Sequence, residues 1–101
     1  MTRVLVTAAS KYGSTLEIAE AIGARLATDG RVDVTVTPAE DAPDPTGYDA
    51  VVVGSAVYAG RWLKPAREWV DANREALQAR RVWLFSSGPL GDPPQAGGGS
   101  R

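Results

Sequence analysis

Short apolar runs alternate with one-sided apolar stripes along this chain, and this alternation predicts strands separated by helices. The apolar run at 4–6 predicts the first strand. A helix is predicted over 15–28, where apolar residues recur at the spacing of one helix face. At its start, Ser14 and Glu17 have the spacing of a capping box, and the Asp-Gly pair at 29–30 is a typical stop signal.

Three further strands and a second helix follow. The segment 32–36 alternates at period two, as an edge strand with one exposed face does. The runs at 50–53 and 82–85 are apolar without alternation, which is typical of central parallel strands buried on both faces. The acidic connection 38–47 is short for a crossover helix, so we expect an extended or one-turn crossover. The second helix, with Pro65 acceptable in its first turn, has apolar positions at Ala66, Trp69, Val70 and Leu77.

This order of elements predicts a single α/β domain. We expect a three-layer sandwich in which helices cover both faces of a parallel sheet through right-handed crossovers. A chain of 101 residues has room for one domain, which we assign to 1–92. The segment 93–101 is rich in Pro, Gly and Ser and is predicted to be a disordered tail.

Charge and residue inventory exclude several classes of function. The formal net charge is −1, and no basic run is longer than Arg80-Arg81, which argues against a nucleic-acid partner. The chain has no Cys and no His, so disulfides, Cys/His zinc sites, Ser-His-Asp triads and thiol nucleophiles are excluded. No segment is long enough to span a bilayer and no signal peptide is recognisable, so a cytoplasmic location is expected. Any chemistry is therefore expected to come mainly from a bound cofactor.

Three loops are expected beyond the carboxyl ends of the strands, where ligands of open α/β sheets bind. They cover 9–14, 55–61 and 86–91. In the first loop, Gly13 lets the backbone approach a ligand, and the N-terminus of the following helix favours an anion such as a phosphate monoester. Hydroxyl groups that can donate to phosphate oxygens belong to Ser10, Ser14 and Thr15.

The first loop lacks both the Walker P-loop and the G-x-G-x-x-G fingerprint, which disfavours nucleoside triphosphates and NAD as ligands. An alternative interpretation gives it no ligand: Ser14 caps the helix and the other hydroxyls are solvated.

The other two loops suit a flat ring. Small residues surround Tyr58, whose own ring can stack on a planar ligand in an offset arrangement. Trp62 either shields an edge of that ligand or begins the next helix, and we favour the structural role. In the third loop, backbone groups and Leu90 are available to the other side of the ring, although this signal is weak alone. Together the loops favour a planar ligand with a phosphate tail.

The segment 6–22, VTAASKYGSTLEIAEAI, resembles the signature of the flavodoxin family. Ala8 departs from that signature, which usually has an aromatic residue there. The segments 48–62 and 83–91 resemble the flavodoxin-domain branch that includes the menaquinone-dependent protoporphyrinogen oxidases. The resemblance covers roughly 3–92. Residues on the signature positions are Ser10, Gly13, Thr15, Ala19 and Ile22.

The resemblance implies a flavodoxin-like fold that binds flavin mononucleotide (FMN) and acts in electron transfer. It implies that the FMN phosphate is surrounded by Ser10, Lys11, Tyr12, Gly13, Ser14 and Thr15. It implies that the isoalloxazine is bordered by Ser55, Ala56, Val57, Tyr58, Ala59 and Gly60, and by Ser86, Ser87, Gly88, Pro89, Leu90 and Gly91. The branch-level likeness implies an alternative, the oxidation of protoporphyrinogen with a quinone as acceptor. We assign no catalytic side chain and no metal ligand.

The expected sheet differs from the family pattern at one edge. Flavodoxin-like sheets have five strands in the order 2-1-3-4-5, whereas this chain supplies four, in the order 2-1-3-4, as a C-terminally incomplete domain would. The strand at 82–85 is then an unpaired apolar edge that can bind another chain or a second copy. A third hypothesis is therefore a truncated, non-enzymatic fragment or an interaction module. The connection 38–47 contains three acidic residues, Glu40, Asp41 and Asp44. They either attract a basic redox partner or, as we favour, are simply solvated.

Overall fold

The computed structural model describes residues 2–11 and 13–87, and it has the predicted α/β architecture. Four parallel strands pair in the order β2-β1-β3-β5, which confirms the predicted order 2-1-3-4. Their bounds are β1 Thr2–Ala9, β2 Val32–Pro38, β3 Ala50–Tyr58 and β5 Arg81–Ser87. The expectation of four strands was one short, because a two-residue strand, β4 (Arg61–Trp62), pairs antiparallel with the end of β3.

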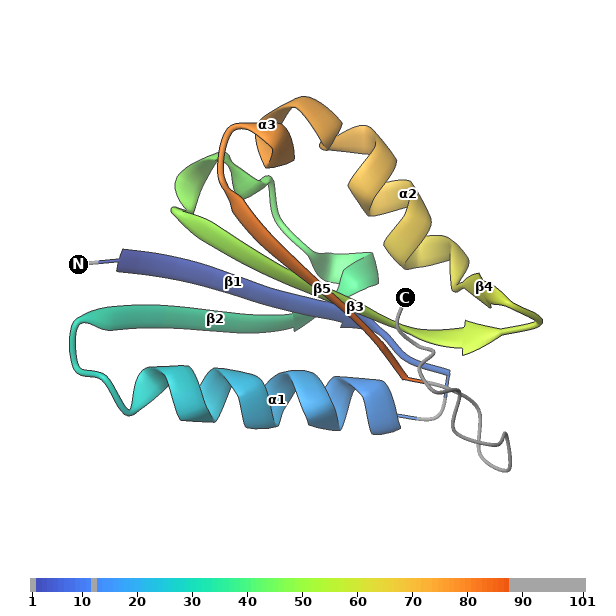
Figure 1. The fold of residues 1–101 in the computed structure, drawn as a ribbon, viewed down its shortest axis with the longest axis horizontal. Helices are drawn as coiled ribbons and strands as arrows, with labels where there is room; N and C mark the ends of the chain where they lie inside the picture. The colour runs from blue at the N-terminus through green and yellow to red at the C-terminus, as the bar shows by residue number, and fades with distance from the viewer. Residues whose placement is uncertain (1, 12, 88–101) are drawn as a thin grey trace.

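The two faces of the sheet carry separate apolar clusters, because successive residues of a strand point to opposite faces. Val6 and Val52 pack on the face that α1 (Ser14–Ala27) covers. Leu5 and Val51 pack on the other face, against the helices α2 (Lys64–Ala72) and α3 (Arg74–Gln78). Figure 1 shows the resulting three layers, with α1 on one side of the sheet and α2 and α3 on the other.

The start of α1 differs from the predicted capping box. Ser14 is the first residue of the helix, and the N-cap is Gly13, with φ of 90° and no side-chain cap. A left-handed φ favours glycine, because other residues are strained there. The hydroxyl that accepts from a first-turn amide comes instead from Ser10, whose Oγ lies 3.2 Å from the Thr15 nitrogen.

The second helical segment, which the apolar pattern predicted as one helix, is divided at Asn73. Asn73 has φ of −117° and ψ of 22°, and its Nδ2 donates to the Trp69 carbonyl oxygen at 2.8 Å. This side-chain bond competes with helix continuation, so α2 ends and α3 starts afresh. Pro65 lies in the first turn of α2, as predicted.

The crossover from β2 to β3 is made of two single turns, η1 (Ala39–Asp41) and η2 (Pro45–Gly47), as expected. The Thr46 amide donates to the Asp44 carboxylate at 2.9 Å, and this bond lowers the pKa of Asp44. The acidic segment is therefore an ordered part of the described chain. No helix among residues 2–11 and 13–87 has the length and hydropathy needed to cross a membrane.

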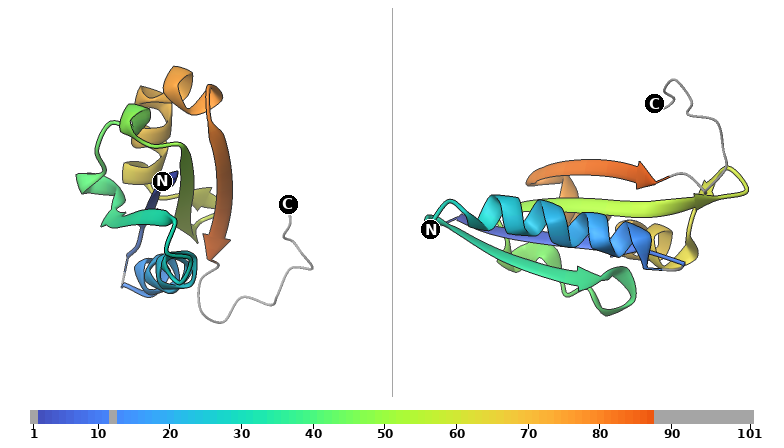
Figure 2. Two further views of the ribbon diagram at one scale, coloured as in Figure 1. Left: turned by 90° about the vertical axis from the view of Figure 1, so that its left-hand side faces the viewer. Right: turned by 90° about the horizontal axis from the view of Figure 1, so that it is seen from below.

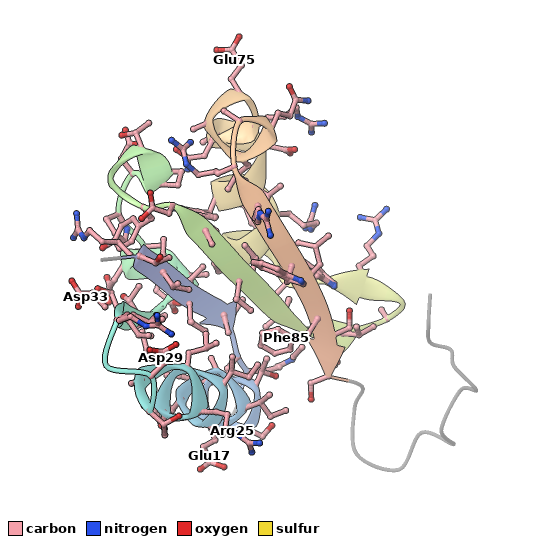
Figure 3. The ribbon with its side chains drawn as sticks, turned by 60° about the vertical axis from the view of Figure 1, so that its left-hand side comes forward. Glu17, Arg25, Asp29, Asp33, Glu75 and Phe85 are labelled. Atoms are coloured by element: carbon pink, nitrogen blue, oxygen red, sulfur yellow. The ribbon has the colours of Figure 1, made fainter. Side chains whose placement is uncertain are left out.

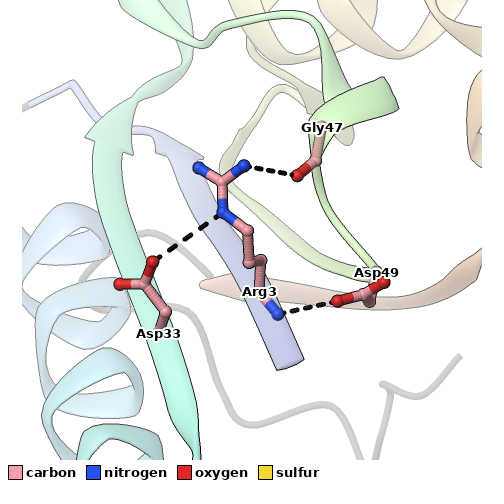
Figure 4. Close-up of polar contacts among 4 residues, drawn as sticks. All are labelled: Arg3, Asp33, Gly47 and Asp49. Carbon is pink, nitrogen blue, oxygen red and sulfur yellow. Dashed lines mark hydrogen bonds and ion pairs between the residues drawn. The ribbon is translucent and has the colours of Figure 1, made fainter. Parts of the chain in front are cut away.

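Arg3 ties this crossover to the amino ends of the strands (Figure 4). Its Nη1 donates to the Gly47 carbonyl oxygen at 2.9 Å, its Nε lies 3.7 Å from an Asp33 carboxylate oxygen, and its backbone amide donates to Asp49 at 2.8 Å. Its guanidinium also lies 4.8 Å from the centre of the Tyr48 ring. One side chain thus joins β1, β2 and the crossover.

Candidate functional site

The carboxyl ends of three strands form one row at the predicted ligand edge. Ala9 of β1 pairs with Ser55 of β3, and Ser55 pairs with Ser86 of β5. Because these strands are parallel, the loops that leave them emerge at the same side of the molecule. The described residues of the three segments chosen from the sequence are therefore neighbours in space at Ala9, Ser55 and Ser86.

Thr15 has the most unusual side-chain environment in the first loop. Its side chain is fully buried, yet its Oγ1 has no hydrogen-bond partner within the described ranges 2–11 and 13–87. A buried hydroxyl without a partner loses its hydration with no compensation, which folded proteins usually avoid. It lies in the first turn of α1, where backbone N–H groups and the helix dipole favour an anion.

Ser10 and Gly13 complete the anion-binding geometry. Because Ser10 Oγ accepts from the Thr15 amide, its own O–H remains able to donate to an anion. A side-chain carbon placed on Gly13 would meet no atom of the described chain within 4 Å, so the space in front of this turn is open. Tyr12, which the sequence also placed here, lies outside the described residues.

Lys11 connects the first loop to Tyr58. Its Nζ lies 3.8 Å from the centre of the Tyr58 ring, and the Tyr58 side chain is 59% exposed. A cation over an aromatic face is attracted by the quadrupole of the ring. The contact places a positive charge and an exposed aromatic ring side by side, and Lys11 lies two residues before the N-cap of α1.

The second loop is shorter than the predicted 55–61. β3 continues through Tyr58, so Ser55, Ala56 and Val57 lie in the strand. The chain then reverses in a two-residue turn at Ala59 and Gly60, with φ of 53° and 76°. Two positive φ values are typical of a type I′ hairpin, and this hairpin forms β4. The apolar run did not reveal the extension, because small residues at 54–56 interrupt the strand pattern.

The hydroxyl of Ser55 is used within the protein. It is buried, accepts from the Leu63 amide at 2.9 Å and donates to the Ala56 carbonyl oxygen at 2.8 Å. These bonds hold the start of α2 against β3. The Ser55 hydroxyl therefore connects β3 to the residue that precedes α2.

Trp62 joins the second loop to the third. Its Nε1 donates to Ser86 Oγ at 2.8 Å, and its ring is half-buried beside the cluster that contains Ala66. It lies in β4 and not at a helix start, and its contacts agree with the structural role favoured from the sequence. Ser86 and Ser87 end β5, whereas Gly88, Pro89, Leu90 and Gly91 lie outside the described residues.

Thr7 is a buried polar residue that the sequence did not single out. Its Oγ1 has no hydrogen-bond partner in the described part of the chain. Thr7 shares a strand face with Leu5, which packs with Trp69 on the side opposite α1. Alternation within an apolar strand gave no signal for it. Among the described residues no group of three or more acidic side chains is placed to hold a metal ion.

Comparison with known proteins identifies the family. The sequence matches the flavodoxin domain family over residues 5–96. The chain belongs to the flavodoxin domain family. A comparison with curated proteins finds no significant match.

Solved flavodoxins share the fold of this flavodoxin domain. A flavodoxin from the domain Archaea is 26% identical, with a TM-score of 0.78, over 88% of this chain and 64% of that one. A short-chain flavodoxin associated with a non-canonical PDU bacterial microcompartment is 23% identical, with a TM-score of 0.74, over 87% of this chain and 62% of that one. Fusobacterium nucleatum flavodoxin bound to flavin mononucleotide is 15% identical, with a TM-score of 0.73, over 90% and 55%. The chain thus spans less than two thirds of the length of these flavodoxins.

Proposed function

We propose that this flavodoxin domain binds FMN and works in electron transfer. The observation that carries the proposal is the contact of the Tyr58 ring with Lys11, which lies two residues before the N-cap of α1. An anion-binding turn next to an exposed aromatic ring suits a ligand with a phosphate at one end and a flat ring system at the other. The Fusobacterium flavodoxin of the same fold, which binds FMN, supports the choice of ligand.

The phosphate end would be held by the first loop. Thr15 Oγ1 and the Ser10 hydroxyl would donate to phosphate oxygens, which would satisfy the buried Thr15 hydroxyl. Gly13 and the first-turn amides of α1 would approach the anion closely. Lys11 adds a positive charge beside Tyr58. These groups favour FMN over riboflavin, which has no phosphate.

The ring would lie against Tyr58 and the end of β3. When bound, FMN supplies the redox chemistry, because it accepts and donates electrons that these side chains cannot carry. Tyr58 would stack on the ring, and the small residues 54–56 would leave room for it. The protein would thus orient the flavin and exclude water from one face.

Titration of the full chain with FMN tests the proposal. We expect quenching of flavin fluorescence, tight binding of FMN and much weaker binding of riboflavin, with inorganic phosphate competing only against FMN. Ser10→Ala should weaken FMN binding, whereas Thr28→Ala, which removes a hydroxyl at the far end of α1, should leave it unchanged. Absence of any flavin binding would show that the proposed function is wrong.

A second candidate is the oxidation of protoporphyrinogen with a quinone as acceptor. It is supported by the resemblance of 48–62 and 83–91 to the protoporphyrinogen oxidase branch. Fold kinship alone does not decide a reaction. Anaerobic turnover of protoporphyrinogen with menadione, compared with free flavin, distinguishes this oxidase from a carrier that exchanges electrons with a redox partner protein.

We also propose that the chain associates with itself through β5. Trp83 and Leu84 on this strand are 53% and 65% exposed, although the apolar run predicted a buried strand. Exposed apolar side chains on an edge strand favour pairing with another strand.

A further inference from the structure

The three loops at the ligand edge contain no acidic residue. The chain has 12 acidic residues, but none of them falls in 9–14, 55–61 or 86–91. The stretch 50–67 also has no Asp or Glu, and its charged residues are all basic. They are Arg61 in β4 and, at the start of α2, Lys64 and Arg67. We call these three side chains the basic rim.

The basic rim lies next to Tyr58. Arg61 is the cross-strand partner of Tyr58 in the β3–β4 hairpin, so the two side chains are close neighbours on the same face of the hairpin. Arg67 Nε donates to the carbonyl oxygen of Trp62, the residue after Arg61, at 3.1 Å. All three rim residues are exposed, and Figure 2 shows the hairpin protruding at this end of the sheet.

The charges of the basic rim contribute little to the stability of the fold. Lys64 and Arg67 stand near the N-terminus of α2, where the helix dipole disfavours cations and where no acidic residue occurs. Lys64 Nζ lies 3.8 Å from a Glu68 carboxylate, but the two side chains are 73% and 66% exposed, so this pair is weak. The Arg61 guanidinium has no hydrogen bond or ion pair within residues 2–11 and 13–87. Positive charge at these positions therefore remains available to a partner.

We infer that the basic rim docks the acidic face of a redox partner protein. The inference rests on the proposed electron transfer, because the flavin would lie against Tyr58 and a protein on the rim would bring its own redox group close to it. Redox encounters bury little surface and depend on electrostatic steering, so a few exposed charges of one sign suit them. The partner is therefore expected to carry carboxylates around its redox group.

A protein face suits the basic rim better than other polyanions do. The apolar side of α2 is buried through Ala66 and Trp69, so the rim has no apolar face beside it to enter a bilayer. Three cations neutralise too few phosphates to bind a nucleic acid tightly. An electron-transfer partner needs only a weak and reversible contact.

Acidic side chains limit the basic rim on one side. Ala39 of η1 packs with Ala66 of α2, and Glu40 and Asp41 follow Ala39 in the same turn. These carboxylates would repel an acidic surface. Docking is therefore centred on Arg61 and the hairpin.

One carrier protein in two charge forms tests the inference. Native cytochrome c is basic, and succinylation of its lysines makes it acidic while keeping the haem. For the full chain without FMN, we expect calorimetric binding of the succinylated form at low ionic strength, weakening as salt is added, and little binding of the native form. Arg61→Glu and Lys64→Glu should each weaken binding by about fivefold, whereas Arg61→Lys should retain it. An acid at the first position of α2 favours the helix, so the effect of Lys64→Glu would not reflect unfolding.

Arg25→Glu is the matched control, because it changes the net charge by the same amount as Arg61→Glu. Arg25 lies in the last turn of α1 and points away from the sheet (Figure 3). This variant should bind succinylated cytochrome c as the wild type does. Equal losses in Arg25→Glu and Arg61→Glu, unchanged binding by Arg61→Glu, or tighter binding of the native form would each overturn the inference.

Haem reduction connects docking to electron transfer. Reduced, FMN-loaded chain should pass one electron to each ferric haem, faster for the succinylated form at low ionic strength, and Arg61→Glu should remove this difference. If the chain binds no flavin, the proposed function is wrong, while calorimetry without FMN still decides whether the basic rim docks an acidic protein. Binding of phosphatidylserine vesicles but not of succinylated cytochrome c would assign the rim to a membrane surface and overturn the inference.

Discussion

Polar groups at the two ends of the parallel strands differ in whether they have hydrogen-bond partners within the protein. At the amino ends, Arg3 bonds to Gly47 and pairs with Asp33, and Arg80 Nε donates to the Tyr48 carbonyl oxygen at 2.9 Å. At the carboxyl ends, Thr15 Oγ1 is buried with no partner in the described part of the chain, and Tyr58 is largely exposed.

This difference distinguishes a region whose polar groups stabilise the fold from the region that we propose binds the flavin. Groups at the amino ends satisfy one another, so a ligand would have to displace existing bonds. Groups at the carboxyl ends retain donors and an aromatic face that a ligand can use. Substitutions at the two ends should therefore affect different measurements, stability at one end and flavin affinity at the other.

The largest effect is expected for Thr15→Val. Loss of a hydrogen bond to a charged phosphate should weaken FMN binding by about 10- to 100-fold, since such bonds contribute about 1.5–3 kcal/mol. The apoprotein should be as stable as the wild type or more stable, because the unpaired hydroxyl is gone. Thr7→Val is the matched control: it also removes a buried, unpaired hydroxyl, but FMN affinity should not change. Equal losses of affinity in both variants would contradict the assignment of Thr15.

Gly13→Ala should show the next largest effect. The left-handed φ of Gly13 makes alanine unfavourable by about 1–2 kcal/mol, and the added carbon enters the open space in front of the turn. We expect lower stability in urea and lower FMN affinity together. Gly30→Ala, also with no atom of the described chain near the added carbon, should change neither. A Gly13→Ala variant with wild-type affinity would place the phosphate elsewhere.

Arg3→Ala should lower stability without changing flavin affinity. It removes a bond to the Gly47 carbonyl oxygen, the pair with Asp33 and the contact with Tyr48, and we expect a loss of about 1–2 kcal/mol in the free energy of unfolding. Arg31→Ala, whose ion pair with Asp29 is highly exposed, should change stability little. If Arg3→Ala weakened FMN binding tenfold at unchanged stability, the contrast between the two ends would fail.

The smallest effect is expected at Asp44. The Thr46 amide lowers the pKa of this carboxyl below its ordinary value, so its contribution to stability is present above the unfolded-state pKa and is lost as pH falls through the folded-state pKa. Asp44→Asn keeps an acceptor for Thr46 but does not titrate, so the acid limb of its stability profile should be flatter than that of the wild type. Urea unfolding between neutral and acid pH measures this difference, and identical acid limbs would contradict it.

The sequence predicted the fold well because periodicity and burial depend on local composition. The uninterrupted apolar runs at 50–53 and 82–85 correctly indicated parallel strands, and the short segment 38–47 correctly indicated a crossover without a full helix, which is made of two single turns. The helix division at Asn73 was missed, because the bond from its side chain to Trp69 leaves no mark in the apolar pattern. The capping box was wrong for a similar reason: a hydroxyl four residues earlier, that of Ser10, accepts from the first turn of α1.

By itself, the sequence determined the order of the elements and placed three loops at one end of a parallel sheet, because strand and helix periods are readable along the chain. Only the tertiary structure decided how each hydroxyl is used. The Ser55 hydroxyl is hydrogen-bonded to Leu63 and Ala56, whereas the Thr15 hydroxyl has no partner among the described residues. Hydrogen bonds depend on which distant segments meet, and the folded arrangement of those segments therefore decides which groups remain for a ligand.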